Sequence, residues 1–315
     1  MTIDMAVLPW TGRTTVTVGT FDGIHRGHRE VLDEIVRRAV AAGRASVVVT
    51  FEPHPLRVIA PDRAPRLLTT WSEKRLLLPL LGVDYVHVLE FTEALRRLTP
   101  EAFVRRILIG RLRVAELVIG HDHGFGRDRK GDAETLHRLG SEADFTVDVV
   151  GAVRVGEVSV SSTAIRHAVE AGDLGAARAG LGRPYSILGE VVAGAGRGRR
   201  LGFPTANMRI DPDKCLPPEG VYAARVDIEG SRFEAMANLG ARPTFDERDP
   251  RLELHLLDWP DEPLYGTRPS VEFVARLRAV RRFDGPGALA AQLESDRHAA
   301  RQVLAKNGVV ERGVA

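Results

Sequence analysis

Apolar residues in the first part of the chain change from a strand pattern to a helical pattern and back. Residues 14–18 predict a strand, and the uninterrupted β-branched run at 45–51 is typical of a buried parallel strand. Between them lies a helical stripe that Gly43 ends, made of Val31, Leu32, Ile35, Val36 and Ala39. Strand, helix and strand in this order predict a βαβ unit.

Further apolar runs extend this alternation. Strands are predicted at 85–89, 116–119 and 146–150, separated by helical patterns. This order favours a Rossmann-like α/β class, a doubly wound parallel sheet that collects its ligands at the carboxyl ends of the strands. The loops that should lie at that edge are residues 19–28, 52–55 and 120–131.

Near residue 183 the pattern changes to short strands with turns. These strands are predicted at 187–193, 221–228, 232–239, 252–257 and 271–280, and one long helix follows at 287–306. The pattern predicts an antiparallel β-barrel with a terminal helix. We therefore expect two domains, residues 1–183 and residues 184–315.

Composition agrees with this organisation and narrows the class of partner. A chain of 315 residues, 44% hydrophobic and 27% charged, can bury two cores. The 44 Lys and Arg residues nearly balance the 42 Asp and Glu residues, so we expect no nucleic acid and no membrane as partner. Lysine is scarce among the basic residues, which we interpret as a compositional bias.

Cysteine usage and hydropathy bear on the compartment. Cys215 is the only cysteine, which excludes an intramolecular disulfide and a cysteine zinc cluster and favours a packed thiol. The first residues lack a secretory pattern, and no apolar stretch approaches the ~20 residues of a membrane span. We expect a cytoplasmic protein that is a monomer or a weak homo-oligomer.

The loop G-T-F-D-G-I-H-R-G-H at residues 19–28 joins the first strand to the first helix. Its glycines permit close backbone approach, and the N–H groups and dipole of the helix start favour an anion such as phosphate. His25 and His28, three residues apart, can donate hydrogen bonds to the same oxygens. The loop lacks the Lys-Ser/Thr pair of a P-loop. An ordinary turn with a capping histidine is the alternative interpretation.

Three other segments of the first half carry candidate chemistry. Residues 53–55 stiffen a loop and fix the direction of His54, although a plain rigid turn explains them equally well. Residues 120–131 make a poor metal loop, because adjacent His-Asp-His is unfavourable geometry and the following basic residues repel a cation. Residues 161–166 combine hydroxyls at a helix start with Arg166, which indicates either a simple N-cap or a phosphate contact.

The second half contains a glycine-rich basic loop that leads into Pro-Thr-Ala-Asn, at residues 194–207. Thr205 and Asn207 supply hard oxygens that suit Mg²⁺ beside phosphate. The alternative interpretation is a basic surface loop that touches RNA and has no catalytic role. On the later strand, Glu253 and His255 share one face and leucines occupy the other. That polar face is either exposed to solvent or functional.

Taken together, these motifs resemble those of the bacterial bifunctional riboflavin kinase/FMN adenylyltransferases, a family within the HxGH nucleotidyltransferases. Residues 19–28 are similar to the family's G-x-F-D-G-x-H-x-G-H, residues 161–166 to S-S-T-x-I-R, and residues 198–207 to G-R-x-L-G-F-P-T-A-N. The resemblance covers roughly residues 13–305. His123 departs from it, standing where the family has Phe, and so does Val280 near the C-terminal helix.

The resemblance implies two reactions. A C-terminal kinase would convert riboflavin to FMN, with Glu253 as base and Mg²⁺ held by Thr205 and Asn207. An N-terminal adenylyltransferase would convert FMN and ATP to FAD and pyrophosphate. In that reaction His25 and His28 would donate hydrogen bonds to the charge that develops on the phosphates, and Arg166 would hold the pyrophosphate leaving group. The expected ligands are riboflavin, FMN, FAD, ATP and Mg²⁺.

The resemblance also assigns binding positions. The catalytic residues are His25, His28, Arg166 and Glu253. The nucleotide-binding positions are Gly19, Phe21, Asp22, Gly23, His25, His28, Asp122, Ser162, Thr163, Arg166, Gly194, Arg199, Gly202, Thr205 and Asn207. The flavin-binding positions are His54, Pro55, Asp122 and Phe125.

Two other functions stay open at this stage. An adenylyltransferase of another cofactor pathway would explain residues 16–28 but leave residues 194–258 unexplained. A non-catalytic flavin-binding or regulatory protein would keep both folds. The presence of every expected catalytic side chain argues against it.

Overall fold

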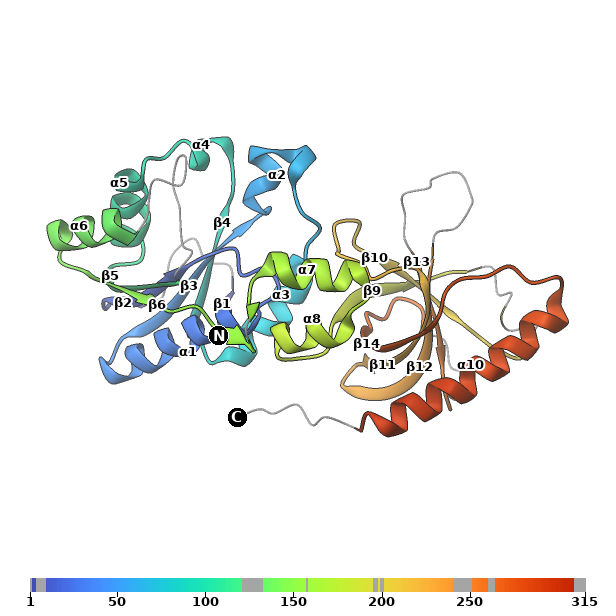
Figure 1. The fold of residues 1–315 in the computed structure, drawn as a ribbon. Helices are drawn as coiled ribbons and strands as arrows, with labels where there is room; N and C mark the ends of the chain where they lie inside the picture. Colours follow the sequence, from blue (N-terminus) through green and yellow to red (C-terminus); the bar gives the residue numbers. More distant parts are fainter. Residues whose placement is uncertain are drawn as a thin grey trace. The chain divides into compact units, whose positions relative to one another are not determined.

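The computed structural model describes residues 2–3, 10–120, 133–156, 158–194, 198, 201–240, 251–259 and 264–308. Contacts divide the chain into two compact units, Met1–Ser162 and Thr163–Ala315 (Figure 1). Each unit has its own sheet and is described by itself.

The first unit is built on a parallel sheet whose strands, in the described residues, have the order β1-β4-β3-β2-β5-β6. These strands are β1 (Thr2–Ile3), β2 (Thr14–Val18), β3 (Ala45–Glu52), β4 (Tyr85–Glu90), β5 (Val114–Gly120) and β6 (Thr146–Val150). A separate hairpin pairs β7 (Arg154–Val155) with β8 (Val158–Ser159). The helices and helical turns are α1 (Arg26–Ala41), α2 (Pro55–Ile59), η1 (Pro61–Arg63), α3 (Trp71–Leu77), η2 (Leu78–Leu81), α4 (Glu93–Arg96), α5 (Pro100–Phe103), η3 (Val104–Ile109) and α6 (Ala133–Ala143).

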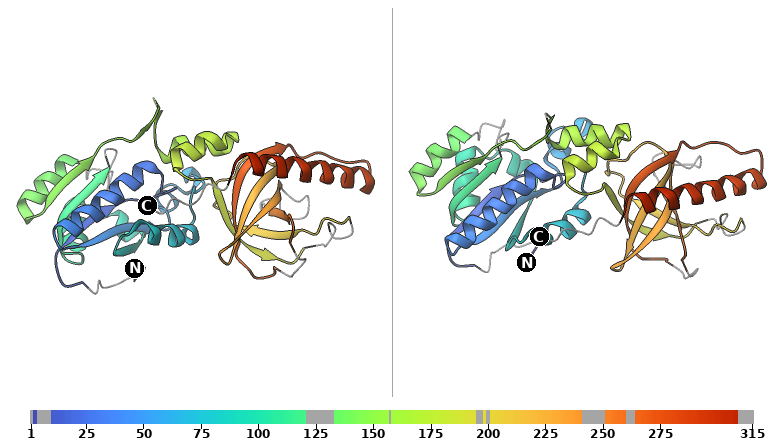
Figure 2. Two further views of the ribbon diagram at one scale, coloured as in Figure 1. Left: turned by 90° about the horizontal axis from the view of Figure 1, so that it is seen from below. Right: turned by 60° about the horizontal axis from the view of Figure 1, so that its bottom comes forward.

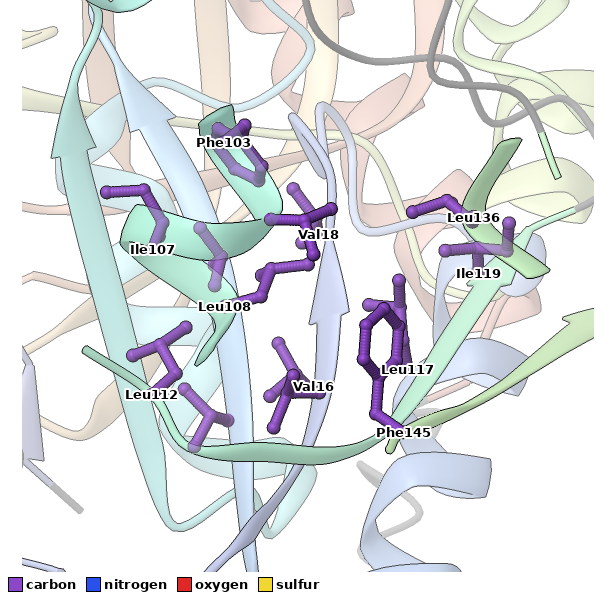
Figure 3. Packing of buried hydrophobic residues seen from close by; sticks show 14 of the residues in the cluster. Val16, Val18, Phe103, Ile107, Leu108, Leu112, Leu117, Ile119, Leu136 and Phe145 are labelled. Atoms are coloured by element: carbon purple, nitrogen blue, oxygen red, sulfur yellow. The ribbon is translucent and has the colours of Figure 1, made fainter. Parts of the chain in front are cut away.

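Apolar layers cover both faces of this sheet. Val47 and Val49 of β3 pack in one buried cluster, and the intervening Val48 packs in another with Leu32 and Ile35 of α1. This is the alternation that strand geometry imposes. Figure 3 shows the first cluster, where side chains of α5 and η3 meet those of β2. Burial on both faces explains why β3 is a continuous apolar run in the sequence.

The strand order reverses direction at β2, which lies between β3 and β5. This reversal is the topological switch point of a doubly wound sheet, where the loops at the carboxyl ends of the strands diverge and leave room for a ligand. The loop after β2, residues 19–25, therefore starts at the position that favours ligand binding.

Among its described residues, the second unit contains the helices α7 and α8, a closed antiparallel barrel and a long terminal helix. Its elements are α7 (Ser162–Ala171), α8 (Leu174–Leu181), β9 (Ser186–Val192), β10 (Ala206–Ile210), β11 (Gly220–Ile228), β12 (Ser231–Gly240), β13 (Arg251–Leu256), β14 (Ser270–Arg278) and α10 (Pro286–Lys306). Among the described residues the barrel closes in the order β10-β13-β12-β11-β14-β9. Helix α10 packs against β11, β12 and β14 (Figure 2).

The predicted fold class is confirmed in both halves. Strands β2 and β6 have the predicted bounds, and the other predicted strands agree within two residues at either end. Four strands of the described residues were not predicted: the short β1, β7 and β8 of the hairpin, and β10. Strand β10 escaped because its five residues follow directly on the motif loop. The domain boundary at residue 183 stays a prediction, since contacts divide the chain after Ser162.

A fragment comparison tests which unit needs α7 and α8. Helix α8 packs against β14, and its Ala177 and Leu181 are buried. Burial of a leucine side chain contributes about 2 kcal/mol. A fragment of residues 161–315 should therefore exceed a fragment of residues 184–315 by at least about 2 kcal/mol in free energy of unfolding, measured in urea. Equal stabilities would show that the two helices contribute nothing to the barrel.

Candidate active sites

The loop after β2 is held in a strained conformation by burial of its apolar side chains. Phe21 and Ile24 adopt positive φ angles of 49° and 41°, which non-glycine residues rarely do. Both side chains are buried in the cluster beside α1. Burial of two large side chains exceeds the cost of about 1–2 kcal/mol for each left-handed residue. The loop is thereby shaped before any ligand binds.

His25 caps helix α1 and stacks on His28. The Nδ1 atom of His25 accepts a hydrogen bond from the backbone N–H of His28 at 3.2 Å, and the ring centroids lie 3.6 Å apart. An accepting Nδ1 in a neutral ring places the proton on Nε2. The cap and the donor role are therefore compatible, because they use different nitrogen atoms of His25.

Asp22 organises the loop from within. Its side chain is 1% exposed, and Oδ1 accepts a hydrogen bond from the Thr69 N–H at 2.9 Å. The Gly23 N–H donates to the Thr69 hydroxyl at 2.8 Å, and the Ser162 hydroxyl donates to the Asp22 carbonyl at 2.8 Å. These bonds join the loop to two segments that are distant in sequence.

Lys74 on α3 is the main feature of this site that sequence reasoning missed. Its Nζ donates to the carbonyl of Thr20 at 2.8 Å, and the residue is only 2% exposed. Burial lowers the pKa of Lys74, and the nearby charges of Asp22 and Glu52 oppose that shift. Lysine is scarce in this sequence, which could have drawn attention to Lys74. The same scarcity is explained equally well by a compositional bias.

The other predicted residues of this half are more scattered. His54 caps α2, with Nδ1 accepting from the Leu56 N–H at 3.3 Å, and Pro55 begins that helix directly after β3. Ser162 begins α7, Thr163 is exposed, and Arg166 is half-buried one turn later. Gly19 donates its N–H to the Val49 carbonyl at the end of β2. Asp122 and Phe125, together with Arg199 of the other half, lie outside the described residues.

In the barrel, strand pairing brings Asn207 and Glu253 together. They are register partners in the β10–β13 pair, and Asn238 of β12 is opposite Glu253 on its other side. Cross-strand partners project from the same face of a sheet. The predicted alternation on β13 is confirmed, because Leu252, Leu254 and Leu256 are buried on the opposite face.

Gly194 and Gly198 allow two close approaches beside these residues. A Cβ atom on Gly194 would stand 1.9 Å from Nδ2 of Asn207, so any side chain there would displace the amide. A Cβ atom on Gly198 would stand 2.2 Å from the Phe203 carbonyl oxygen and 3.2 Å from the Thr205 hydroxyl. The Gly198 carbonyl accepts hydrogen bonds from the N–H groups of Leu201 and Phe203, and Gly202 between them adopts a positive φ of 78°. Gly194 and Gly198 therefore lie close to the residues at the start of β10.

The donor set here suits a hard cation that also binds phosphate. Thr205 and Asn207 offer a hydroxyl and an amide oxygen, which Mg²⁺ accepts together with phosphate oxygens and water. In the part of the chain that the structure describes, no group of three or more His, Cys, Asp and Glu side chains could hold a metal. No helix among the described residues is long and apolar enough to cross a bilayer.

Two family models match different parts of the chain. A family model described as FAD synthetase matches residues 9–164, and a second one, described as riboflavin kinase, matches residues 181–304. The bifunctional riboflavin kinase/FMN adenylyltransferase of Pseudomonas fluorescens is 40% identical over 290 residues, which cover 92% of each chain. The protein of the same name from Escherichia coli K12 is 38% identical over 288 residues, 91% of each chain.

A solved structure shares the fold over nearly the whole chain. It is described as a macrolide-efflux protein from Streptococcus pneumoniae and has a TM-score of 0.82 at 32% identity. The match covers 93% of this chain and 95% of that one. The two-part architecture is thus present in an experimental structure.

The buried Lys74 makes a prediction about pH. The pKa of Lys74 is lowered in the folded state. Between this lowered pKa and the ordinary lysine pKa of ~10.4, the unfolded chain therefore holds the proton of Lys74 more fully than the folded protein does. The free energy of unfolding contributed by Lys74 should then rise with pH in that window. Urea denaturation from about pH 7 to about pH 10 measures it as the difference between wild type and Lys74→Met. A difference that stays constant or falls would contradict the lowered pKa.

Proposed function

This chain belongs to the family of bifunctional riboflavin kinase/FMN adenylyltransferases, and we propose which of its residues perform each reaction. The enzyme phosphorylates riboflavin with ATP to give FMN, then adenylylates FMN with a second ATP to give FAD and pyrophosphate. Membership in this family excludes the two alternatives left open by the sequence, an adenylyltransferase of another cofactor pathway and a non-catalytic flavin-binding or regulatory protein. The match to riboflavin kinase accounts for the residues that another adenylyltransferase would leave unexplained.

In the kinase reaction Glu253 acts as the general base. The observation that supports this role is its pairing with Asn207 across β10 and β13. Glu253 would take the proton of the riboflavin 5′-hydroxyl as its oxygen attacks the γ-phosphorus of ATP. Thr205 and Asn207 would hold Mg²⁺, which when bound neutralises charge on the transferred phosphoryl group. Gly194, Gly202 and Arg199 would line the nucleotide beside them.

In the adenylyltransferase reaction the histidines act as donors. A phosphate oxygen of FMN attacks the α-phosphorus of ATP, and because that oxygen is already anionic the step needs no general base. His25 and His28 would donate to charge that develops on the phosphates. The accepting Nδ1 of His25 supports this role, since it leaves the proton on Nε2. Arg166 would hold the departing pyrophosphate, one helical turn after Ser162.

The flavin would bind at the carboxyl edge of the parallel sheet. His54 and Pro55 follow β3, which neighbours β2, and Asp122 and Phe125 follow β5 in sequence. The remaining nucleotide positions would contact the ATP of the adenylyltransferase reaction. They are Gly19, Phe21, Asp22, Gly23, Ser162 and Thr163. A cytoplasmic location, a monomeric or weakly associating state and the absence of nucleic-acid partners stay predictions.

Glu253→Gln tests the kinase assignment, because it keeps the shape of the side chain but removes its basicity. FMN formation from riboflavin, ATP and Mg²⁺, followed by chromatography, should fall by ~10² or more. FAD formation from supplied FMN should persist in the same preparation. Glu234→Gln, at an exposed position of β12, is the matched control and should leave both activities unchanged. Near-normal FMN formation in Glu253→Gln would reduce Glu253 to a structural residue.

A series at His28 separates a donor from a base. His28→Ala should depress FAD formation from FMN by ~10² to 10³ at every pH, as expected for loss of one preorganised donor. His28→Asn and His28→Gln should recover part of the rate, because an amide donates a hydrogen bond but cannot act as a base. His137→Ala, on the exposed side of α6, is the control, and riboflavin phosphorylation should be normal in all variants. Unchanged turnover in His28→Ala would remove this residue from the site.

A further inference from the structure

His255 links the strand that carries Glu253 to the loop that carries Thr205. It lies two residues after Glu253 on the same face of β13. Its Nδ1 is 2.9 Å from the carbonyl oxygen of Pro204, the residue before Thr205. The kinase reaction as assigned above gives His255 no part, so this contact needs an explanation of its own.

The chemistry of the contact determines which group donates. A carbonyl oxygen can only accept, so Nδ1 of His255 must carry the proton of this hydrogen bond. Both the neutral Nδ1–H tautomer and the imidazolium ion can donate in this way. Nδ1 is therefore committed to the loop and cannot serve as a proton acceptor for a substrate.

The contact lies where backbone pairing between β10 and β13 stops. Ala206 is paired with Leu254 and begins β10, so one further step of the register would place Thr205 opposite His255. Pro204 has no backbone N–H and cannot donate to a neighbouring strand. The side chain of His255 holds the loop at the point where the backbone ladder no longer does.

The ring of His255 is itself held on a rigid support. It packs against the ring of Phe203 with 5.2 Å between centroids. Phe203 belongs to the apolar cluster that includes Ala300 and Leu304 of α10, and the guanidinium of Arg297 lies 5.7 Å from its centroid. Terminal helix, loop and strand therefore meet around the hydrogen bond to Pro204.

We propose that His255 is a positioning residue for the kinase reaction, which sets Thr205 and Asn207 at their distance from Glu253 by donating from Nδ1 to the Pro204 carbonyl. This proposal rests on the function proposed for those three residues. A displacement of about 1 Å at a reacting centre can cost ~10²-fold in rate. Loss of the bond should therefore impair phosphoryl transfer, and this role does not require His255 to touch either substrate.

Three variants of the full-length protein test the atom that matters. Asn carries its amide nitrogen on Cγ, as His carries Nδ1, whereas the amide nitrogen of Gln lies one bond further out, near the position of Nε2. His255→Leu and His255→Gln should lower kcat for FMN formation by ~10 to 10² and raise the Mg²⁺ concentration needed for half-maximal rate several-fold. His255→Asn should restore most of both quantities.

The second activity of the chain is an internal control. FAD formation from supplied FMN should be unchanged in all three variants, which shows that the protein is folded outside the barrel, and thermal unfolding reports on the barrel. His298→Leu, at an exposed position of α10, controls for loss of a histidine. Rescue by Gln in place of Asn would overturn the proposal in favour of a role at Nε2. Equal, near-normal kinetics in all three would overturn it in favour of plain packing.

A spectroscopic measurement tests the bond without turnover. In ¹H–¹⁵N spectra of protein labelled at histidine, the signal that His255→Asn removes should show the proton of the neutral ring on Nδ1. A neutral ring with its proton on Nε2 would overturn the proposal. The positioning role of His255 can fail while the role of Glu253 as general base holds. If Glu253→Gln impairs FMN formation and the His255 variants do not, only the positioning role fails.

Discussion

Backbone pairing on both sides of two strands, β2 and β10, determines where the two motif loops, residues 19–25 and 194–205, are joined to the fold. Strand β2 is paired with β3 and β5, and strand β10 is paired with β9 and β13. Each motif loop is joined directly to one of these strands, so the loop has one fixed end. In the sheet, pairing places the loop at a switch point. In the barrel, pairing sets the register that puts Asn207 opposite Glu253.

Polar side chains also bond to carbonyl groups within each loop, close to the strand that the loop joins. Lys74 donates to Thr20, Ser162 donates to Asp22, and His255 donates to Pro204. A loop near a phosphate cannot be packed on all sides by apolar groups, because its N–H groups must face the ligand. Side-chain donors to the carbonyls on the other side of the chain give such a loop a defined shape. The two sites reach the same solution in unrelated folds.

The sequence was most informative where chemistry is local. The helix-capping position of His25, the alternation of Glu253 with leucines, and the Gly-rich loops could be read from spacing alone, because each depends on residues within one or two turns. The same local logic failed for β10. Its pattern is too short to stand out, and its existence depends on pairing with β9 and β13.

By itself the sequence determined the two fold classes, since periodicity is a property of neighbouring positions, and the resemblance of its motifs indicated the family. Only the tertiary structure revealed the contacts of Lys74 with the Thr20 carbonyl and of His255 with the Pro204 carbonyl, whose partners are 54 and 51 residues away in the sequence. The sequence around a lysine or a histidine does not show to which carbonyl group its side chain will donate a hydrogen bond. The hydrogen-bond partner depends on which elements pack together, and this packing depends on the shape and burial of the whole unit.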